Sequence, residues 1–310
     1  MNIKDAIKSF NKNMLVAMPT ETVYGLAAPV SNLNLINKIF KLKERPLFDP
    51  LIVHVSSIEM AKSYCAVWSE DHEKLAAAFW PGPLTIITEK NNKIDKLLTA
   101  GLDTVGLRLP DHRLACDFID MLGEAVAAPS ANTFTKTSPT TCEHVKKYFN
   151  SEDVYILDGG DCNVGIESTI VQIMSNQVVV LRPGMISKDD IKKVLPHLDV
   201  VDGVEHLKSI PGAHHTHYKP DYKLVVTMRN LTQDNILTLN KECGGDGEYI
   251  KMNESPQLIA RSIYSILHRP IIDGHSYKLI DFSSNVSNKK CDHWQAILNR
   301  LRKAAYKIIE

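Results

Sequence analysis

Short apolar runs alternate with helix-like stretches through the first two thirds of the chain, and this alternation constrains the fold most strongly. Each run has the length of a buried strand, and the stretches between them are long enough for helices. Strands that alternate with helices predict an α/β fold, in which helices cover a sheet. We expect strands at 14–18, 51–55, 84–88, 105–109, 125–128, 154–157, 169–173 and 178–181, and helices at 33–42, 70–79, 111–122, 141–148 and 188–195.

Three residues mark the expected ends of these helices. Asp111 and Thr141 stand where N-caps are expected, and Pro196 follows the last helix as a natural stop.

The segment 209–220 interrupts the α/β pattern, because it has a proline towards each end and no apolar period. Such a segment favours an inter-domain linker. At 310 residues the chain is long enough for roughly two domains. We therefore predict a first domain over 1–206, a linker over 207–221 and a smaller α/β domain over 222–310.

Beyond the linker, strands are expected at 223–227 and 277–281, and helices at 256–267 and 292–308. The last helix has the clearest pattern in the chain. Its apolar residues fall on one face at three- and four-residue spacing, which predicts that this face packs on a small sheet. These residues are Trp294, Ile297, Leu298, Leu301, Ala305 and Ile308.

The charges of the chain balance, with 36 basic and 36 acidic residues. A protein that coats nucleic acid without specificity is strongly basic, so any RNA contact here must be a local patch. The six cysteines are scattered and form no C-x-x-C pair, which argues against a zinc ribbon and a secreted disulfide scaffold. No apolar run has the length of a signal peptide or a membrane span. We expect a cytoplasmic protein.

The familiar motifs of nucleotide and hydrolytic sites are absent from the sequence. It contains no G-x-x-x-x-G-K-[ST] phosphate loop, no G-x-G-x-x-G, no H-E-x-x-H and no G-x-S-x-G. If the protein binds a nucleotide, it must do so by another scheme.

Two segments near the N-terminus carry polar residues beside expected strands. The stretch 19–26, Pro-Thr-Glu-Thr-Val-Tyr-Gly-Leu, is either a polar turn or a place where hydroxyl groups orient a small polar ligand. The stretch 41–55 brings Lys43 and Arg45 into a proline-framed loop. Cations on a rigid loop suit a polyphosphate. A basic helix end followed by a core histidine, His54, explains the same residues equally well.

Two later segments are similar in kind. The run of small residues 126–132 ends in Ser130 and Asn132, which could cap the next element or bind phosphate and ribose oxygens. A glycine-rich turn leads through 159–171 into a strand that begins with a Ser-Thr pair. Arg182 comes directly after the following expected strand. Glycine-rich turns are common before strands, so this turn alone indicates no function.

Together these segments resemble the YrdC-domain family in its long, two-domain form. The resemblance is carried by the K-x-R of Lys43 and Arg45, the P-L-I-V-H-V, the P-T-E-T-V-Y-G-L and the S-x-N of Ser130 and Asn132. The motifs W-P-G-P-L-T, V-G-L-R-L-P, E-S-T-I-V, R-P-G and P-G…H-Y-x-P match as well. The match is strong over 10–220 and weaker beyond. It implies a twisted mixed sheet flanked by helices, followed by a smaller Rossmann-like α/β domain.

The resemblance also implies a reaction. L-threonine, bicarbonate and ATP would give threonylcarbamoyl-AMP and pyrophosphate, a nucleotidyl transfer that needs no protein nucleophile. Mg²⁺ would arrive with ATP, and no metal site of the protein itself is expected. A separate transferase would then move the threonylcarbamoyl group to tRNA, next to the anticodon. A weak contact with tRNA stays open.

The resemblance assigns residues to both substrates. Lys43 and Arg45 would be catalytic through charge stabilisation. The carboxylate of Asp49 would repel phosphates unless it binds the base, the ribose or magnesium-bound water. Tyr218 would close over the nucleotide from the linker, which we expect to act as a lid. The threonine-binding residues would be Thr22, His54, Arg108, Ala128 and Ser168, and the ATP-binding residues Lys43, Arg45, Asp49, Thr104, Ser130, Asn132, Ser138, Arg182 and Tyr218.

Two other functions remain open from the residues. A carbamoyltransferase that forms carbamoyl-AMP uses the same kind of domain, but it carries additional domains for which this chain has no room. An RNA-binding or ribosome-assembly protein without turnover is the other, because the concave basic cleft of the fold that the resemblance implies suggests RNA, although the balanced charge weighs against it. The histidines at 214, 215 and 217 are either a metal site or part of a solvated loop.

Overall fold

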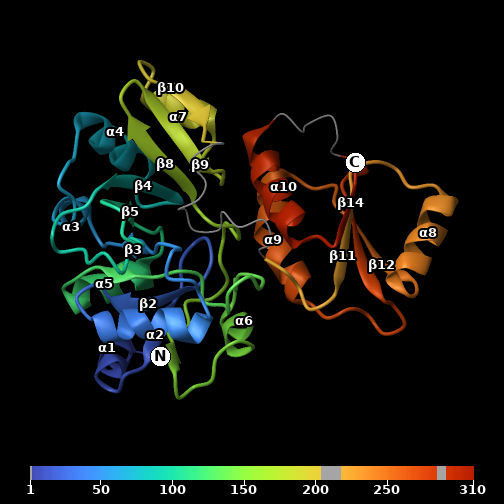
Figure 1. Cartoon of the computed structure of the whole chain (residues 1–310), viewed down its shortest axis with the longest axis horizontal. Helices are drawn as coiled ribbons and strands as arrows, with labels where there is room; N and C mark the ends of the chain where they lie inside the picture. Colours follow the sequence, from blue (N-terminus) through green and yellow to red (C-terminus); the bar gives the residue numbers. More distant parts are fainter. Residues whose placement is uncertain (1, 204–217, 285–290) are drawn as a thin grey trace.

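Two separate sheets, each with helices packed against it, divide the chain (Figure 1). The structure, a computed structural model, describes residues 2–203, 218–284 and 291–310. The expected linker residues 207–217, including the three histidines, lie outside the described residues. The domain boundaries proposed at 206 and 221 therefore stay predictions. No helix in the described part of the chain is long and apolar enough to cross a membrane.

The first sheet has ten strands in the order β10-β9-β8-β4-β5-β3-β6-β2-β1-β7. Neighbours pair both in parallel, as β3 does with β5, and antiparallel, as β4 does with β5. The expected mixed sheet is confirmed. Its strands are β1 (Leu15–Met18), β2 (Gly25–Pro29), β3 (Ile52–His54), β4 (Leu84–Glu89), β5 (Thr104–Arg108), β6 (Val126–Ala127), β7 (Val154–Ile156), β8 (Thr169–Met174), β9 (Gln177–Arg182) and β10 (Asp199–Asp202).

Most of the described helices of this part begin at residues whose side chains accept from the first backbone N–H groups. Thr141 caps α6 as expected, and Ser187 forms a capping box with Asp190 at the start of α7. The expectation for Asp111 is wrong, because His112 occupies the N-cap position of α5 and makes no side-chain cap. The helices are α1 (Ile3–Asn11), α2 (Leu33–Lys43), α3 (Ile58–Lys62), α4 (Glu70–Phe79), α5 (Arg113–Leu122), α6 (Cys142–Lys146) and α7 (Lys188–Val194).

The second sheet has four parallel strands in the order β12-β13-β11-β14. In Figure 1, α9 and α10 lie on the face turned towards the first sheet, and α8 lies on the opposite face. This is the expected smaller α/β domain with helices on both faces. Its elements are β11 (Lys223–Thr227), α8 (Gln233–Cys243), β12 (Gly247–Lys251), α9 (Pro256–His268), β13 (Tyr277–Asp281), α10 (Asp292–Ala304) and β14 (Lys307–Ile309).

The expected helix 292–308 is wrong in its last turn. The helix ends at Ala304, and Ile308 lies in β14, where it pairs with Val226 of β11. The apolar face of α10 does pack inward as predicted, with Trp294, Ile297 and Leu301 buried. The sequence pattern was misleading because an apolar residue in a short edge strand also fits the helical period.

The core of the second part extends across to the first. Val23 and Ile166, from loops of the first part, belong to the same apolar cluster as the buried faces of α9 and α10. Tyr218, which belongs to the predicted linker and is described in the structure, is only 1% exposed within this cluster. The two parts therefore share a packed interface, and the functional residues described next lie beside it.

Candidate active site

Several strand ends meet at one edge of the first sheet. His54 ends β3 and Arg108 ends β5, and the two residues are neighbours in the parallel register of these strands. On the other side of β4, β8 begins at Thr169 and β9 ends at Arg182. Polar side chains that sit far apart in the sequence are brought together here, as is usual at the ends of strands in α/β folds.

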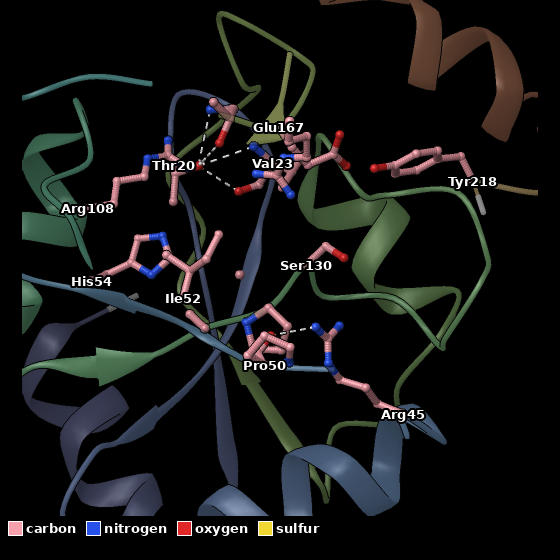
Figure 2. A pocket seen from close by; sticks show the side chains of 15 residues that line it. Thr20, Val23, Arg45, Pro50, Ile52, His54, Arg108, Ser130, Glu167 and Tyr218 are labelled. Atoms are coloured by element: carbon pink, nitrogen blue, oxygen red, sulfur yellow. Dashed lines mark hydrogen bonds between the residues drawn. The ribbon is translucent and has the colours of Figure 1, made fainter. Parts of the chain in front are cut away.

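A pocket opens at this edge, with about 580 Å³ of empty space when its mouth is included (Figure 2). Arg108 and His54 stand at one end of the view, Arg45 at another, and Tyr218 approaches from the side of the second sheet. The lining residues are Thr20, Thr22, Val23, Gly25, Arg45, Pro50, Ile52, His54, Arg108, Ala128, Pro129, Ser130, Glu167, Arg182 and Tyr218.

Arg108 is held rigidly although it is buried. Its Nη2 lies 2.7 Å from Oε2 of Glu21, and its Nε donates to the carbonyl oxygen of Gly82 at 3.3 Å. The exposed fractions of the two charged side chains are 5% and 4%. A guanidinium fixed in this way presents a planar fork that suits a carboxylate.

His54 is a neutral side chain at neutral pH. Burial, and secondarily the nearby charge of Arg108, lowers the pKa of His54 to about 3. Its Nδ1 is buried and has no hydrogen-bond partner in the part of the chain that the structure describes. An unsatisfied buried ring nitrogen is costly, so this atom is well suited to meet a polar group of a ligand.

The threonines of the P-T-E-T motif organise the turn between β1 and β2. Thr20 donates its hydroxyl proton to the carbonyl oxygen of Val23 at 2.7 Å, and its oxygen accepts from the N–H of Thr22 at 3.1 Å. The two threonine hydroxyls are 2.9 Å apart. Thr22 must therefore donate to Thr20, which leaves the lone pairs of the Thr22 hydroxyl available at the pocket wall.

Arg45 lines the pocket and carries its own counter-ion. Its Nη2 lies 3.0 Å from Oδ1 of Asp49, and the guanidinium also donates to the carbonyl oxygens of Asp49 and Pro50. Both side chains are buried. The structure thus places Asp49 behind Arg45, where its carboxylate orients the guanidinium. A direct contact of Asp49 with a nucleotide stays a prediction.

Lys43 lies behind the pocket wall and does not line it. Its amine donates to the carbonyl oxygens of Ser130 and Asn132, at 2.5 Å each. Burial, together with Arg45, lowers the pKa of Lys43 well below its ordinary range. Asn132 in turn donates to the carbonyl oxygens of Thr133 and Lys136. The K-x-R and S-x-N motifs are therefore in direct contact.

Arg182, which lines the pocket, and Ser168 behind it form one hydrogen-bonded unit. The Nε and Nη2 of Arg182 each donate to Ser168, to its carbonyl oxygen and its hydroxyl, at 3.0 Å. The hydroxyl of Ser168 is also 2.8 Å from that of Thr85. Ser168 is fully buried and lies behind the lining residues, so its predicted contact with threonine stays a prediction.

Glu167 is a pocket residue to which the sequence assigned no role. Its carboxylate accepts from Ser138 at 2.7 Å, from Tyr264 at 2.9 and 3.1 Å, and from Arg300 at 3.1 Å. Burial opposes ionisation, but Arg300 and Arg182 lower the pKa of Glu167 to about 2. The carboxylate is charged, and it joins α9 and α10 to the pocket.

Thr104 stands apart from the other predicted residues. It begins β5, at the strand end opposite Arg108, and lines a smaller apolar pocket that shares Pro50 and Ile52 with the first. The remaining lining residues of this second pocket are Leu51, Thr85, Ile87, Thr99, Leu102, Val105, Gly106 and Ile170.

The structure therefore gathers most of the predicted residues in one place. Thr22, Arg45, His54, Arg108, Ala128, Ser130, Arg182 and Tyr218 line the first pocket, while Lys43, Asp49, Asn132, Ser138 and Ser168 support it from behind. Thr20, Val23, Gly25, Ile52 and Glu167 also line the pocket, and Tyr264 and Arg300 support it, although none of them has an assigned role in the sequence analysis. The stretches 19–26 and 41–55 and the E-S-T-I-V motif are the sequence signals for the five lining residues.

Comparison with known proteins identifies the family. A family model described as "Telomere recombination", for Sua5, YciO and YrdC proteins, matches residues 8–184. Another, described as "Threonylcarbamoyl-AMP synthase, C-terminal domain", matches residues 186–306. The chain is 34% identical to the threonylcarbamoyl-AMP synthase of Pyrococcus abyssi, over 99% of this chain and 95% of the relative. The chain belongs to the threonylcarbamoyl-AMP synthase family.

Other members of the threonylcarbamoyl-AMP synthase family are similarly close. The Bacillus subtilis synthase is 34% identical over 98% of this chain and 92% of its own length. The crystal structure of P. abyssi Sua5 complexed with L-threonine superposes with a TM-score of 0.88 at 32% identity, covering 99% of this chain and 95% of that one. The expected two-part α/β fold is confirmed. The expected enzyme class, an ATP-dependent threonylcarbamoyl-AMP synthase that serves tRNA modification, is confirmed as well.

Proposed function

We propose that the pocket of Figure 2 binds L-threonine and ATP side by side and joins them through a carbon derived from bicarbonate. The observation that carries this proposal is the arrangement of three buried arginines around one pocket. Arg108 suits a carboxylate at one end, while Arg45 and Arg182 suit phosphates at the other. A family relative with bound L-threonine supports the choice of amino acid.

The threonine end of the pocket would be formed around Arg108. Its fork would hold the carboxylate of threonine, and the unsatisfied Nδ1 of His54 would meet a polar group of the same molecule. The lone pairs of Thr22 would accept from the amine. Ala128 is small and lines the pocket, where it would leave room for the new carbamate.

The ATP end would extend from Arg45 to Arg182. Ser130 lines the same pocket, and its hydroxyl would be a neutral donor for a phosphate or ribose oxygen. The adenine would enter the adjoining apolar pocket, against Ile52 and Gly106, where Thr104 would hydrogen-bond an edge of the base. Lys43 and Asn132 would act by fixing the loop that carries Ser130. Tyr218 would cover the nucleotide.

The chemistry needs no protein nucleophile. The threonine amine combines with bicarbonate to give a carbamate and water. A carbamate oxygen then attacks the α-phosphorus of ATP, and the bond to the β-phosphate oxygen breaks, so that pyrophosphate leaves. The arginines would stabilise the charge that develops on the phosphates, and the rigid pocket would align the attacking oxygen with the leaving group.

Magnesium would accompany ATP. The carboxylates near the pocket each lie against an arginine: Glu21 on Arg108, Asp49 on Arg45 and Glu167 on Arg300. In residues 2–203, 218–284 and 291–310, no group of three or more His, Cys, Asp or Glu side chains could hold a metal. We propose that Mg²⁺ binds the phosphates of ATP and keeps several of its waters.

The product is a mixed anhydride and needs a partner enzyme to consume it. We propose that a tRNA-modifying transferase in the cytoplasm accepts the threonylcarbamoyl group, which the family role in tRNA modification supports. A weak contact of this chain with tRNA, and the action of the linker as a lid, stay predictions.

Release of pyrophosphate tests the proposed function. The full chain with ATP and Mg²⁺ is expected to release pyrophosphate only when both threonine and bicarbonate are present. Release with carbamoyl phosphate in place of threonine would instead indicate a carbamoyltransferase. Salt-dependent binding of tRNA without any turnover of ATP would indicate a non-enzymatic RNA-binding protein.

A further inference from the structure

One arginine of the second part reaches into the wall of the active site. Arg300 lies in the middle of α10, and its side chain is 1% exposed. Its Nε donates to Oε2 of Glu167 at 3.1 Å and its Nη2 to the carbonyl oxygen of Glu167 at 3.3 Å. Its Nη1 donates to the carbonyl oxygen of Pro183 at 2.5 Å. A single guanidinium therefore holds two segments of the first part.

These two segments are the ones that carry the Arg182–Ser168 unit. Glu167 directly precedes Ser168, the last residue before β8, and Pro183 directly follows Arg182 at the end of β9. Arg182 bonds to Ser168 by two hydrogen bonds. Arg300 thus bonds to the residue before Ser168 and to the residue after Arg182. These bonds fix the distance between Ser168 and Arg182.

We propose that Arg300 is a positioning residue for the reaction: from the second domain it clamps Glu167 and Pro183, and so aims Arg182 at the phosphates of ATP. The inference rests on the proposed function, because it takes Arg182 to be a phosphate ligand. In this role the second domain contributes to catalysis through Arg300, although Arg300 does not touch the substrates.

The surroundings of Glu167 support the clamp. Tyr264 of α9 is fully buried and donates to the same carboxylate, so both interface helices converge on it. Ser138 donates to it from the first part. The low pKa of Glu167 keeps the carboxylate charged, as an acceptor for three side chains must be.

A double-mutant cycle on the full chain tests this role. We expect Arg300→Gln to lower kcat/KM for ATP by about 10²-fold, the effect of a small misplacement of a catalytic group. If Arg300 acts through Arg182, the same substitution in an Arg182→Gln background should cause almost no further loss. Arg302→Gln is the matched control, because Arg302 lies on the same helix and pairs with exposed Glu310. It should leave kcat and both KM values unchanged.

The outcomes separate the clamp from a merely structural contact. An equal loss from Arg300→Gln in both backgrounds, or no loss in either, would overturn the proposal. If Arg300→Gln does not fold, as far-UV circular dichroism would show, Tyr264→Phe decides by the same cycle, since it removes only one hydroxyl from Glu167. Absence of threonine-dependent pyrophosphate release by the wild-type chain would contradict the proposed function itself, independently of the clamp.

Discussion

At the scale of single residues, two of the three pocket arginines are each paired with a buried carboxylate. Glu21 contacts Arg108 and Asp49 contacts Arg45, all four side chains being buried. Desolvating charges is expensive, and close pairing offsets part of that cost. The pairing also fixes the orientation of each guanidinium before a ligand arrives, so little reorganisation remains for binding.

The carboxylate clamp on threonine can be tested at Arg108. Arg108→Lys should keep the charge near Glu21 but lose the bidentate fork, so the KM for threonine should rise at least about tenfold while the KM for ATP changes little. Arg113→Lys is a matched control, because Arg113 is 95% exposed. A threonine titration that is the same in the folded Arg108→Lys variant and in the wild type would exclude the clamp.

The K-x-R residues should differ in what they contribute. Arg45→Ala should lower kcat/KM for ATP by about 10²- to 10³-fold, because one preorganised cation is lost from the pocket. Lys43→Ala should also lower the melting temperature, since the buried amine satisfies two carbonyl oxygens, those of Ser130 and Asn132. Pyrophosphate-release kinetics and thermal unfolding measure the two effects. Near-normal turnover of Arg45→Ala would show that Arg45 does not stabilise the phosphates.

At the scale of elements, a glycine allows the second domain to approach the pocket. Gly165 has φ of +82°, and a Cβ there would lie 2.5 Å from the carbonyl oxygen of Ala260 and from Cα of Arg261 in α9. The loop that precedes Glu167 therefore packs directly on the backbone of this helix. Any larger residue would push α9 away from the pocket.

Gly165→Ala should weaken this interface. We expect a loss of at least about 2 kcal/mol in the free energy of unfolding, from backbone strain and from the clash with α9. Gly123→Ala is a matched control, because Gly123 has φ of +80° but a Cβ at this position would meet nothing within 4 Å. It should show the strain alone, roughly 1–2 kcal/mol. Equal losses in the two variants, measured by chemical denaturation, would mean that α9 yields to the added methyl group.

The elements also show what could be predicted from the sequence. Strands with strong apolar runs, such as 84–88 and 169–173, were found because their side chains are buried whatever their neighbours are. β2 (Gly25–Pro29) was missed, because its Gly-Leu-Ala-Ala-Pro sequence has little β-propensity and forms a strand through burial between β1 and β6. The β-propensity of single residues does not reflect burial between neighbouring strands.

The site was predictable in the same uneven way. Arg108 and His54 lie in recognisable motifs at strand ends, and the structure brings both to the pocket. Arg300 and Tyr264 were not found, because each lies in an amphipathic helix whose pattern indicates only a buried face. The partner that makes each of them functional, Glu167, is 97 residues from Tyr264 and 133 residues from Arg300 in the sequence. Contacts at that separation leave no local signal.

At the scale of the whole molecule, the histidines with the most strongly lowered pKa values, His54, His144 and His268, couple stability to pH. Burial is the main cause that lowers the pKa of His54 to about 3, of His268 to about 3 and of His144 to about 4. The rings of His144 and His268 stack across the interface between the two parts, with centroids 3.9 Å apart. Each imidazole is neutral when folded and takes up a proton more readily when the chain is unfolded.

The sign of the effect follows from these pKa values. Between about pH 6.5 and 4 the unfolded chain binds protons that the folded chain does not, so stability is full above about pH 6.5 and falls as the pH is lowered. Buried His54 alone should contribute about 1.4 kcal/mol per pH unit, and the partly exposed pair less. Thermal unfolding from about pH 8 to about pH 5 should show a smaller slope in His54→Gln than in the wild type. Exposed His275→Gln should keep the wild-type slope, and an unchanged slope in His54→Gln would contradict a neutral buried His54.

We propose that one pocket links threonine to AMP through a carbon from bicarbonate. Mass spectrometry of the products formed from ATP, threonine and ¹³C-bicarbonate tests it most directly. The expected product contains AMP and threonine, is heavier by one mass unit than the product made with ordinary bicarbonate, and forms in equal amount to pyrophosphate. A threonine adenylate without the labelled carbon, or AMP formed without threonine, would contradict the claim.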